Sequence, residues 1–239
     1  MRAVVDGDVA YAPWSELGTV TQDTEAIARH IDRVLALPFI QVDRIRKRAF
    51  RIALDCARGA GGAIMPALRE RVGCTMTGIH VETDGKFPRP PEPVAANLGE
   101  LERLVLHTRA DVGLATDPDV DRLALVSNEG RAIGEDWTLA LAARLALRYR
   151  PGPVVANLST SRIVDDVAAE AGTRVIRAPV GEVNVALRMK TEGAAIGGEG
   201  NGGVILSELH LGRDAPVGVA LLLQMLVEDE EPLSAILAR

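Results

Sequence analysis

Residues 112–126 read VGLATDPDVDRLALV, and three carboxylates stand two residues apart in this stretch, between two apolar runs. On one face of an exposed strand, the charges of Asp117, Asp119 and Asp121 would repel one another. In a loop between two strands, the same oxygens can converge on one hard divalent ion such as Mg²⁺. We therefore predict a metal loop, residues 117–122, between two buried strands.

Arg122 follows the carboxylates directly. A bound cation would repel this guanidinium unless a dianion such as phosphate lay between them. An EF-hand also begins with D-x-D-x-D, but it needs glycine at its sixth position and glutamate at its twelfth, where this chain has Arg122 and Asn128. A phosphatase of the haloacid-dehalogenase type, with Asp117 as nucleophile, and a solvated acidic turn stay open as alternatives.

The composition indicates a soluble α/β protein. Of the 239 residues, 47% are hydrophobic and only 3% aromatic, so we expect an aliphatic core. The net charge of −6 argues against a nucleic-acid partner. Two cysteines are too few for a disulfide framework, which favours the cytoplasm. The most apolar stretch, residues 217–227, is shorter than the roughly 18 residues that cross a bilayer, so we expect no membrane partner.

Apolar periodicity predicts strands that alternate with helices. A strand at 50–55 precedes a helix that ends near residue 72, and a helix at 98–108 precedes the strand that leads into the metal loop. After the Arg-Pro-Gly-Pro break at 150–153 the alternation restarts. This order predicts the α/β class, with two three-layer α/β domains built on mostly parallel sheets. The predicted divisions are a lead-in segment and helix at 1–40, a domain with the metal loop at 41–150, and a second domain at 151–239.

A second loop carries a lone glutamate among glycines. Residues 197–203 read GGEGNGG, after a predicted strand at 194–196 and before the apolar residues 204–206. Glycines let the backbone approach a ligand closely, and Glu199 can accept hydrogen bonds from two neighbouring hydroxyls of a sugar. A hairpin turn with an exposed glutamate is the alternative. His210 and Arg213 follow closely enough to line the same cleft.

In their chain order the two loops resemble those of the α-D-phosphohexomutase family, which includes phosphoglucomutases, phosphomannomutases and phosphoglucosamine mutases. The family's metal loop, D-G-D-x-D-R, is similar to residues 117–122, with Pro118 in place of the glycine. Its sugar loop, G-E-x-S-G, is similar to residues 198–202, with Asn201 in place of the serine. Residues 55–61, 84–88 and 180–182 also resemble segments of the family.

The resemblance implies a role for each site residue. Mg²⁺ would be bound by Asp117, Asp119 and Asp121, and Arg122 would be the catalytic residue that neutralises the phosphoryl group. The hexose phosphate substrate would be bound by the remaining predicted site residues, which are Gly198, Glu199, Asn201, Gly202, His210 and Arg213. The implied reaction interconverts hexose 1-phosphate and 6-phosphate through a phosphoserine and a bisphosphate intermediate, most like that of phosphoglucosamine mutase.

Two motifs of the family are missing from residues 1–239. These are the phosphoserine loop S-H-N-P of the first domain and the phosphate-binding loop R-x-S-G-T of the last. The resemblance therefore implies the two central domains of four, with residues 1–40 as a remnant of the missing first domain. The chain is then expected to be inactive without its flanking domains. A dehalogenase-type phosphatase and a non-catalytic module that binds Mg²⁺ and a sugar phosphate stay open as alternatives.

Overall fold

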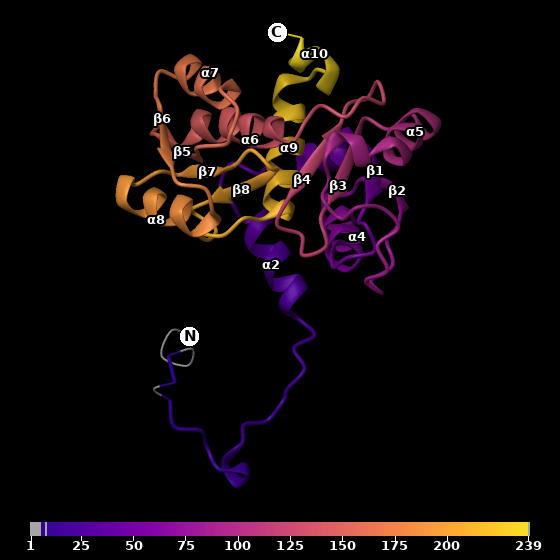
Figure 1. Ribbon diagram of the computed structural model, residues 1–239. Helices are drawn as coiled ribbons and strands as arrows, with labels where there is room; N and C mark the ends of the chain where they lie inside the picture. Colours follow the sequence, from indigo (N-terminus) through magenta and orange to yellow (C-terminus); the bar gives the residue numbers. More distant parts are fainter. Residues whose placement is uncertain (1–5, 8, 239) are drawn as a thin grey trace.

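A computed structural model of the chain describes residues 6–7 and 9–238. Residues 1–5 and 8, which belong to the predicted lead-in segment, lie outside this part. Residues 9–23 are exposed and carry one short 3-10 turn, η1 (Trp14–Glu16). They run away from the rest of the molecule and return to it at helix α2 (Ala26–Leu35) (Figure 1).

The first sheet has the strand order β2-β1-β3-β4. The first three strands are parallel, and β4 is antiparallel to β3. Alternate side chains of β1 enter different cores, because successive residues of a strand face opposite sides. The strands are β1 (Arg51–Asp55), β2 (Thr75–Ile79), β3 (Val112–Thr116) and β4 (Leu123–Val126).

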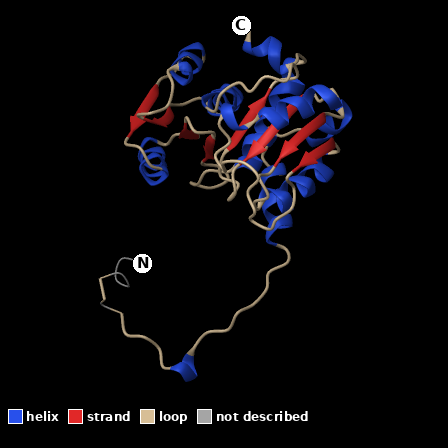
Figure 2. Cartoon of the chain, turned by 45° about the vertical axis from the view of Figure 1, so that its right-hand side comes forward, coloured by secondary structure: helices blue, strands red, loops and turns tan. Residues whose placement is uncertain are grey.

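The second sheet repeats this topology, with the order β6-β5-β7-β8 and an antiparallel last strand. The strands are β5 (Val154–Asn157), β6 (Val175–Ala178), β7 (Ile196–Glu199) and β8 (Gly203–Leu206). Figure 2 shows strands of both sheets in red, with blue helices around them. The prediction of two α/β units with mostly parallel sheets is confirmed.

Helices cover both faces of each sheet. Helix α5 packs on one face of the first sheet, while α2, α3, α4 and α9 pack toward the other. Helix α8 packs on one face of the second sheet, and α6 and α7 cover the other. The further helices are α3 (Val42–Arg48), α4 (Gly61–Val72), η2 (Ala95–Asn97), α5 (Gly99–Thr108), α6 (Asp136–Tyr149), α7 (Ile163–Glu170), α8 (Glu182–Glu192), α9 (Ala215–Asp229) and α10 (Leu233–Leu237).

Helices α6 and α9 join the two halves of the molecule. They pack on each other, and both contact β4 of the first sheet and β8 of the second. One continuous apolar core therefore includes residues of both sheets. This shared core holds the edge strands β4 and β8, and the loops that precede them, in a fixed relation. Within residues 9–238 no helix is long and apolar enough to cross a bilayer.

The strand ends bring the predicted site residues to one edge. Asp117 follows the carboxyl end of β3, and Glu199 is the last residue of β7. In open α/β sheets, ligands bind outside the carboxyl ends of the strands. The prediction placed Glu199 in the loop after the strand, but it is paired with Gly203 in the β7–β8 ladder. The predicted divisions at residues 40 and 150 stay predictions.

Candidate functional site

The metal loop is closed by its own first carboxylate. Asp117 Oδ1 accepts hydrogen bonds from the backbone N–H groups of Asp121 at 3.1 Å and Arg122 at 3.0 Å. Val120 has a φ of +66°, which is rare for a β-branched residue and is the kind of local strain found at functional sites. The loop also packs on Gly59, where a Cβ would lie 2.5 Å from Pro118 Cα.

The three carboxylates converge as predicted. One oxygen each from Asp117, Asp119 and Asp121 lies within 4.8 Å of the others. Burial, together with the neighbouring Asp121 and Asp119 carboxylates, raises the pKa of Asp117 to about 7. Asp121 Oδ1 is buried and has no hydrogen-bond partner among the described residues. An oxygen-only donor set with crowded negative charge and an unsatisfied oxygen fits a hard divalent cation such as Mg²⁺.

Arg122 lies beside this cluster. Its Nε is 3.5 Å from Asp117 Oδ2 and 3.6 Å from Asp121 Oδ1, and its Nη1 is 3.6 Å from Glu92 Oε1. The Nε atom is buried without a hydrogen-bond partner in the described part of the chain. Arg122 therefore partly offsets the carboxylate charge and keeps a donor for a further anion.

Glu199 is buried and held by the second sheet. Its Oε1 accepts hydrogen bonds from Asn157 Nδ2 at 2.7 Å and from the Gly181 backbone N–H at 3.1 Å. These two donors come from the carboxyl ends of β5 and β6, so the loops of three neighbouring strands meet at this carboxylate. Asn201 Nδ2 lies 3.5 Å from Glu199 Oε2, while Asn201 Oδ1 accepts from the Gly203 N–H at 3.2 Å.

The two loops are joined by backbone hydrogen bonding. Arg122 and Gly203 form an antiparallel bridge, and the Leu123 N–H donates to Gly202 O at 3.0 Å. Gly202 has a φ of +92°, and a Cβ there would lie 2.5 Å from Leu123 O. Only glycine meets both requirements, since it adopts positive φ without strain and has no Cβ. The second loop therefore lies directly against the end of the metal loop.

The side chain of Arg213 contacts both loops at this junction. Its Nη2 contacts Asp121 Oδ2, and its Nη1 lies 2.5 Å from Glu199 Oε2. Its backbone N–H donates to Glu182 Oε1 at 2.7 Å. Burial opposes the charged form, but Asp121 and Glu199 raise the pKa of Arg213. One partly buried cation thus links the metal loop to the loop that carries Glu199.

Family models match both halves of the chain. The model for phosphoglucomutase/phosphomannomutase alpha/beta/alpha domain II matches residues 28–130, and the model for domain III matches residues 134–239. The chain belongs to the phosphoglucomutase/phosphomannomutase family. It contains the two central domains of that family.

Relatives and solved structures agree with this assignment. A probable phosphoglucosamine mutase of Methanopyrus kandleri is 38% identical over 240 residues, which is 100% of this chain and 52% of that relative. A phosphoglucomutase/phosphomannomutase family protein from Burkholderia thailandensis has the same fold, with a TM-score of 0.84 at 24% identity over 99% of this chain and 50% of that one. The chain spans about half the length of the curated relatives it matches.

A more distant structural neighbour has been solved with ligands. N-acetylphosphoglucosamine mutase of Aspergillus fumigatus, in complex with GlcNAc-6P and magnesium, has a TM-score of 0.61 at 15% identity. That match covers 90% of this chain and 48% of the other. At this identity the similarity shows a shared fold.

The structure brings most of the predicted site residues of this phosphoglucomutase/phosphomannomutase chain together. The metal loop, through Asp121 and Arg122, meets the segment that holds Glu199, Asn201, Gly202 and Arg213, and Gly198 precedes Glu199 within β7. His210 is hydrogen-bonded to Asp214, with its Nε2 2.8 Å from Asp214 Oδ2. Its sugar contact stays a prediction.

Sequence reasoning missed Asn157 as a partner of Glu199, and it noted residues 180–182 only as a family-like segment. A signal was present, since Asn157 ends β5 and Gly181 follows β6. Polar residues and glycines at the carboxyl ends of neighbouring parallel strands meet at one edge of the sheet.

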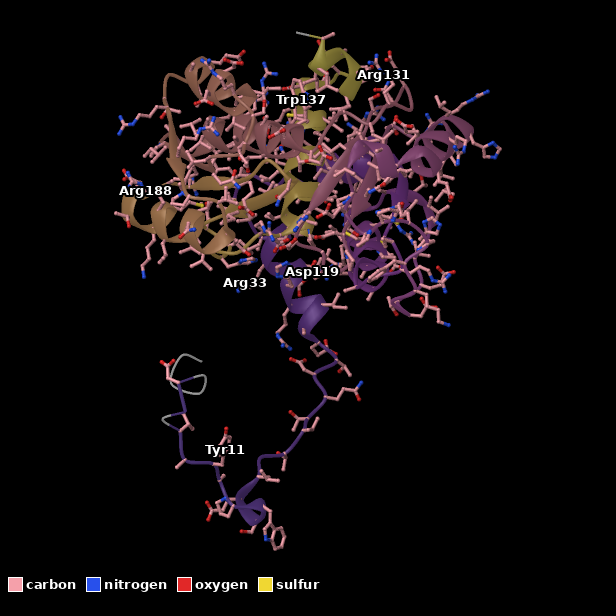
Figure 3. All side chains as sticks on the ribbon, viewed as in Figure 1. Tyr11, Arg33, Asp119, Arg131, Trp137 and Arg188 are labelled. Atoms are coloured by element: carbon pink, nitrogen blue, oxygen red, sulfur yellow. The ribbon has the colours of Figure 1, made fainter. Side chains whose placement is uncertain are left out.

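A cavity of about 640 Å³ lies next to the metal loop. Its lining includes Pro118, Asp119 and Val120 from this loop, and Ile27 from α2. Figure 3 shows Asp119 at the lower edge of the body, where α2 reaches it. The candidate site therefore has open space beside Asp119, the most exposed of its three aspartates.

Proposed function

We propose that this chain forms the metal-binding and sugar-binding parts of a phosphohexomutase active site, which interconverts hexose 1-phosphate and 6-phosphate. Among such enzymes it would be most like a phosphoglucosamine mutase, the name given to its Methanopyrus kandleri relative. The observation that carries the proposal is the position of Arg213, whose guanidinium contacts Asp121 of the metal loop and Glu199 of the second loop. Metal and sugar ligands would therefore occupy one site.

Asp117, Asp119 and Asp121 would hold Mg²⁺. When bound, the ion supplies a Lewis acid that polarises a phosphoryl oxygen. Arg122 would add a fixed positive charge beside it. In phosphoryl transfer, charge spreads over the equatorial oxygens, so positioned cations contribute most of the catalysis. The buried Nε of Arg122, which has no hydrogen-bond partner among the described residues, supports this role.

Glu199 would bind the hydroxyls of the sugar. Asn157 and Gly181 fix its Oε1, which leaves Oε2 to Arg213 and to a ligand. A sugar hydroxyl can donate to Oε2, and Asn201 Nδ2 lies close enough to contact the same hydroxyl. The backbones of Gly198 and Gly202 would let the hexose approach closely.

The reaction also needs a phosphoryl donor. By resemblance this donor is a phosphoserine on the first domain of the family, and a loop of the last domain binds the second phosphate of the bisphosphate intermediate. We therefore propose flanking domains of the same parent enzyme as the partners of this chain. Without them, the chain would bind Mg²⁺ and hexose phosphate but would not turn over.

Calorimetry with glucosamine 6-phosphate in Mg²⁺ tests the assignment of Glu199. We expect saturable binding that weakens at least tenfold in Glu199→Gln, since loss of a charge-assisted hydrogen bond costs about 1.5–3 kcal/mol. Glu70→Gln is the matched control, because Glu70 is exposed in the last turn of α4, at the other end of the helix from the metal loop. Equal affinities of the parent and Glu199→Gln would refute the sugar-binding role.

A second experiment distinguishes a mutase from a non-catalytic binding module and from a dehalogenase-type phosphatase. A separately prepared, serine-phosphorylated first domain and the last domain of a relative are added to the full chain with Mg²⁺. Restored conversion of glucosamine 6-phosphate supports the mutase, and binding without conversion supports a non-catalytic module. Phosphate trapped on Asp117 of the chain alone would instead support the dehalogenase-type phosphatase.

A further inference from the structure

A different set of potential metal ligands lies at the junction of α2 with the segment between β8 and α9. His30 is on α2, His210 lies in the segment after β8, and Asp214 is the N-cap residue of α9. One ligand atom from each lies within 4.8 Å of the others. Asp214 is buried, and the two imidazoles are partly exposed.

Both imidazole nitrogens already meet at one carboxylate oxygen. His30 Nε2 and His210 Nε2 each lie 2.8 Å from the same oxygen, Asp214 Oδ2. The other oxygen, Oδ1, accepts the Val217 N–H at 2.9 Å and so caps α9. The capping bond fixes the carboxylate in an orientation that presents Oδ2 to both imidazoles.

The two segments that supply the donors are also held together by a separate contact. Arg33, one turn along α2 from His30, donates from Nη2 to Leu209 O at 2.8 Å. Helices α2 and α9 pack on each other as well (Figure 1). The arrangement of His30 and His210 therefore does not depend on their shared contact with Asp214 alone.

The chemistry of these donors differs from that of the metal loop. Two imidazole nitrogens and one carboxylate oxygen suit a borderline divalent ion such as Zn²⁺, whereas the three aspartates offer only oxygen. With bonds of about 2.0–2.1 Å, a tetrahedral zinc ion holds its ligand atoms roughly 3.3 Å apart. The 2.8 Å contacts would therefore open by a few tenths of an ångström, and solvent at the exposed imidazole edges can supply a fourth ligand.

The charge state of the carboxylate favours a cation. Burial opposes its ionisation, but the hydrogen bonds from His210, His30 and the Val217 N–H lower the pKa of Asp214 to about 2. Asp214 therefore carries a negative charge at neutral pH. The same carboxylate raises the pKa of His30.

We propose that His30, His210 and Asp214 form a binding site for a Zn²⁺-class ion, separate from the Mg²⁺ loop. The ion would connect α2 to the segment that carries Arg213, the residue next to Asp214. It would thereby restrain the cation that joins the metal loop to Glu199. This site goes beyond the proposed mutase activity and does not require it.

The test is titration of the full chain with Co²⁺ in excess Mg²⁺, followed by visible absorption. Excess Mg²⁺ occupies the oxygen-only loop, so the cobalt spectrum reports the imidazole site. We expect saturation at one equivalent, with the intense bands of a four-coordinate ion with nitrogen ligands. A parent chain with no saturable cobalt signal, or with the weak spectrum of an all-oxygen site, would overturn the proposal.

Variants locate the ion. His30→Gln and His210→Gln should each weaken Co²⁺ and Zn²⁺ binding at least tenfold, a loss that even outer-shell changes can cause. His107→Gln on α5, an exposed imidazole, should bind as the parent does. Asp119→Asn should also bind Co²⁺ as the parent does. Loss of the signal in Asp119→Asn, or its retention in both His30→Gln and His210→Gln, would place the ion elsewhere and refute the site.

Discussion

Arg213 Nη1 lies 2.5 Å from Glu199 Oε2, and the same guanidinium contacts Asp121 through its other terminal nitrogen. Both carboxylates are proposed to bind ligands, Asp121 the Mg²⁺ ion and Glu199 the sugar. In this structure they share one cation instead. A ligand bound to either carboxylate would weaken the pairing of that carboxylate with Arg213. Binding of Mg²⁺ and binding of the sugar should therefore affect each other.

The first prediction concerns Arg213→Met. Methionine keeps much of the aliphatic volume but leaves the buried Glu199 and the half-buried Asp121 without their cation. Removing one partner of a fully buried ion pair typically costs about 3–5 kcal/mol. We expect a fall of about 3 kcal/mol in the free energy of unfolding, measured with urea in the absence of metal. Mg²⁺ should restore part of this loss, because the ion would neutralise Asp121.

Arg188→Met is the control for this experiment. Arg188 forms an exposed pair with Glu192 on α8, and such pairs contribute at most about 1 kcal/mol. An Arg213→Met chain as stable as this control would show that the bridge does not stabilise the junction.

The second prediction concerns Asp119→Asn. Asp119 is exposed and accepts no hydrogen bond among the described residues, so its replacement should not change the free energy of unfolding by more than about 0.5 kcal/mol. Its loss as a ligand should weaken Mg²⁺ binding at least tenfold, as followed by calorimetry. Asp43→Asn, an exposed aspartate on α3, should bind Mg²⁺ as the parent does. Unchanged Mg²⁺ affinity in Asp119→Asn would remove this residue from the metal site.

The third prediction concerns Gly59→Ala. The added Cβ would meet Pro118 Cα at 2.5 Å, and both atoms belong to backbone segments that cannot rotate away. We expect the metal loop to shift and Mg²⁺ affinity to fall, with a loss of about 1–3 kcal/mol in stability. Gly18→Ala is the control, because its Cβ would meet nothing within 4 Å. Equal Mg²⁺ affinity in the two variants would contradict the packing of the loop on Gly59.

The fourth prediction follows from the pKa of Asp117, which rises from 3.8 to about 7 in the folded chain. The folded state then keeps a proton that the unfolded state has lost between pH 4 and 7, so stability falls as pH rises through this window. Urea unfolding without metal at pH 5 and pH 8 should show the decline, and Asp117→Asn should reduce it. Saturating Mg²⁺ should also flatten the dependence, since the ion favours the ionised carboxylate. If the free energy of unfolding had the same pH dependence in the parent and in Asp117→Asn, the raised pKa of Asp117 would be contradicted.

The sequence predicted the strands on both sides of the metal loop because local patterns specify them. The apolar runs at 112–115 and 123–126 are buried in β3 and β4, as expected for strands covered on both faces. Helix α9 was not predicted, because thirteen of its fifteen residues are buried and it has no polar stripe that would reveal a helical period.

The site was only partly predictable, because part of it depends on packing between segments far apart in the sequence. The convergence of Asp117, Asp119 and Asp121 follows from their spacing together with their place in a loop between two buried strands. The pairing of Leu123 with Gly202, and the reach of Arg213 across both loops, depend on α6 and α9 packing between the two sheets. No local pattern encodes that long-range packing. For the same reason the meeting of His30 with Asp214, 184 residues apart in the chain, was not foreseen.

The central claim is that the two loops form one binding site, and linked calorimetry tests it most directly. Glucosamine 6-phosphate is titrated into the full chain with and without Mg²⁺, and Mg²⁺ with and without the sugar phosphate. We predict that each ligand changes the affinity of the other by the same factor, of about 5-fold to 150-fold, as thermodynamic linkage requires. Two affinities that do not depend on each other would contradict a single site.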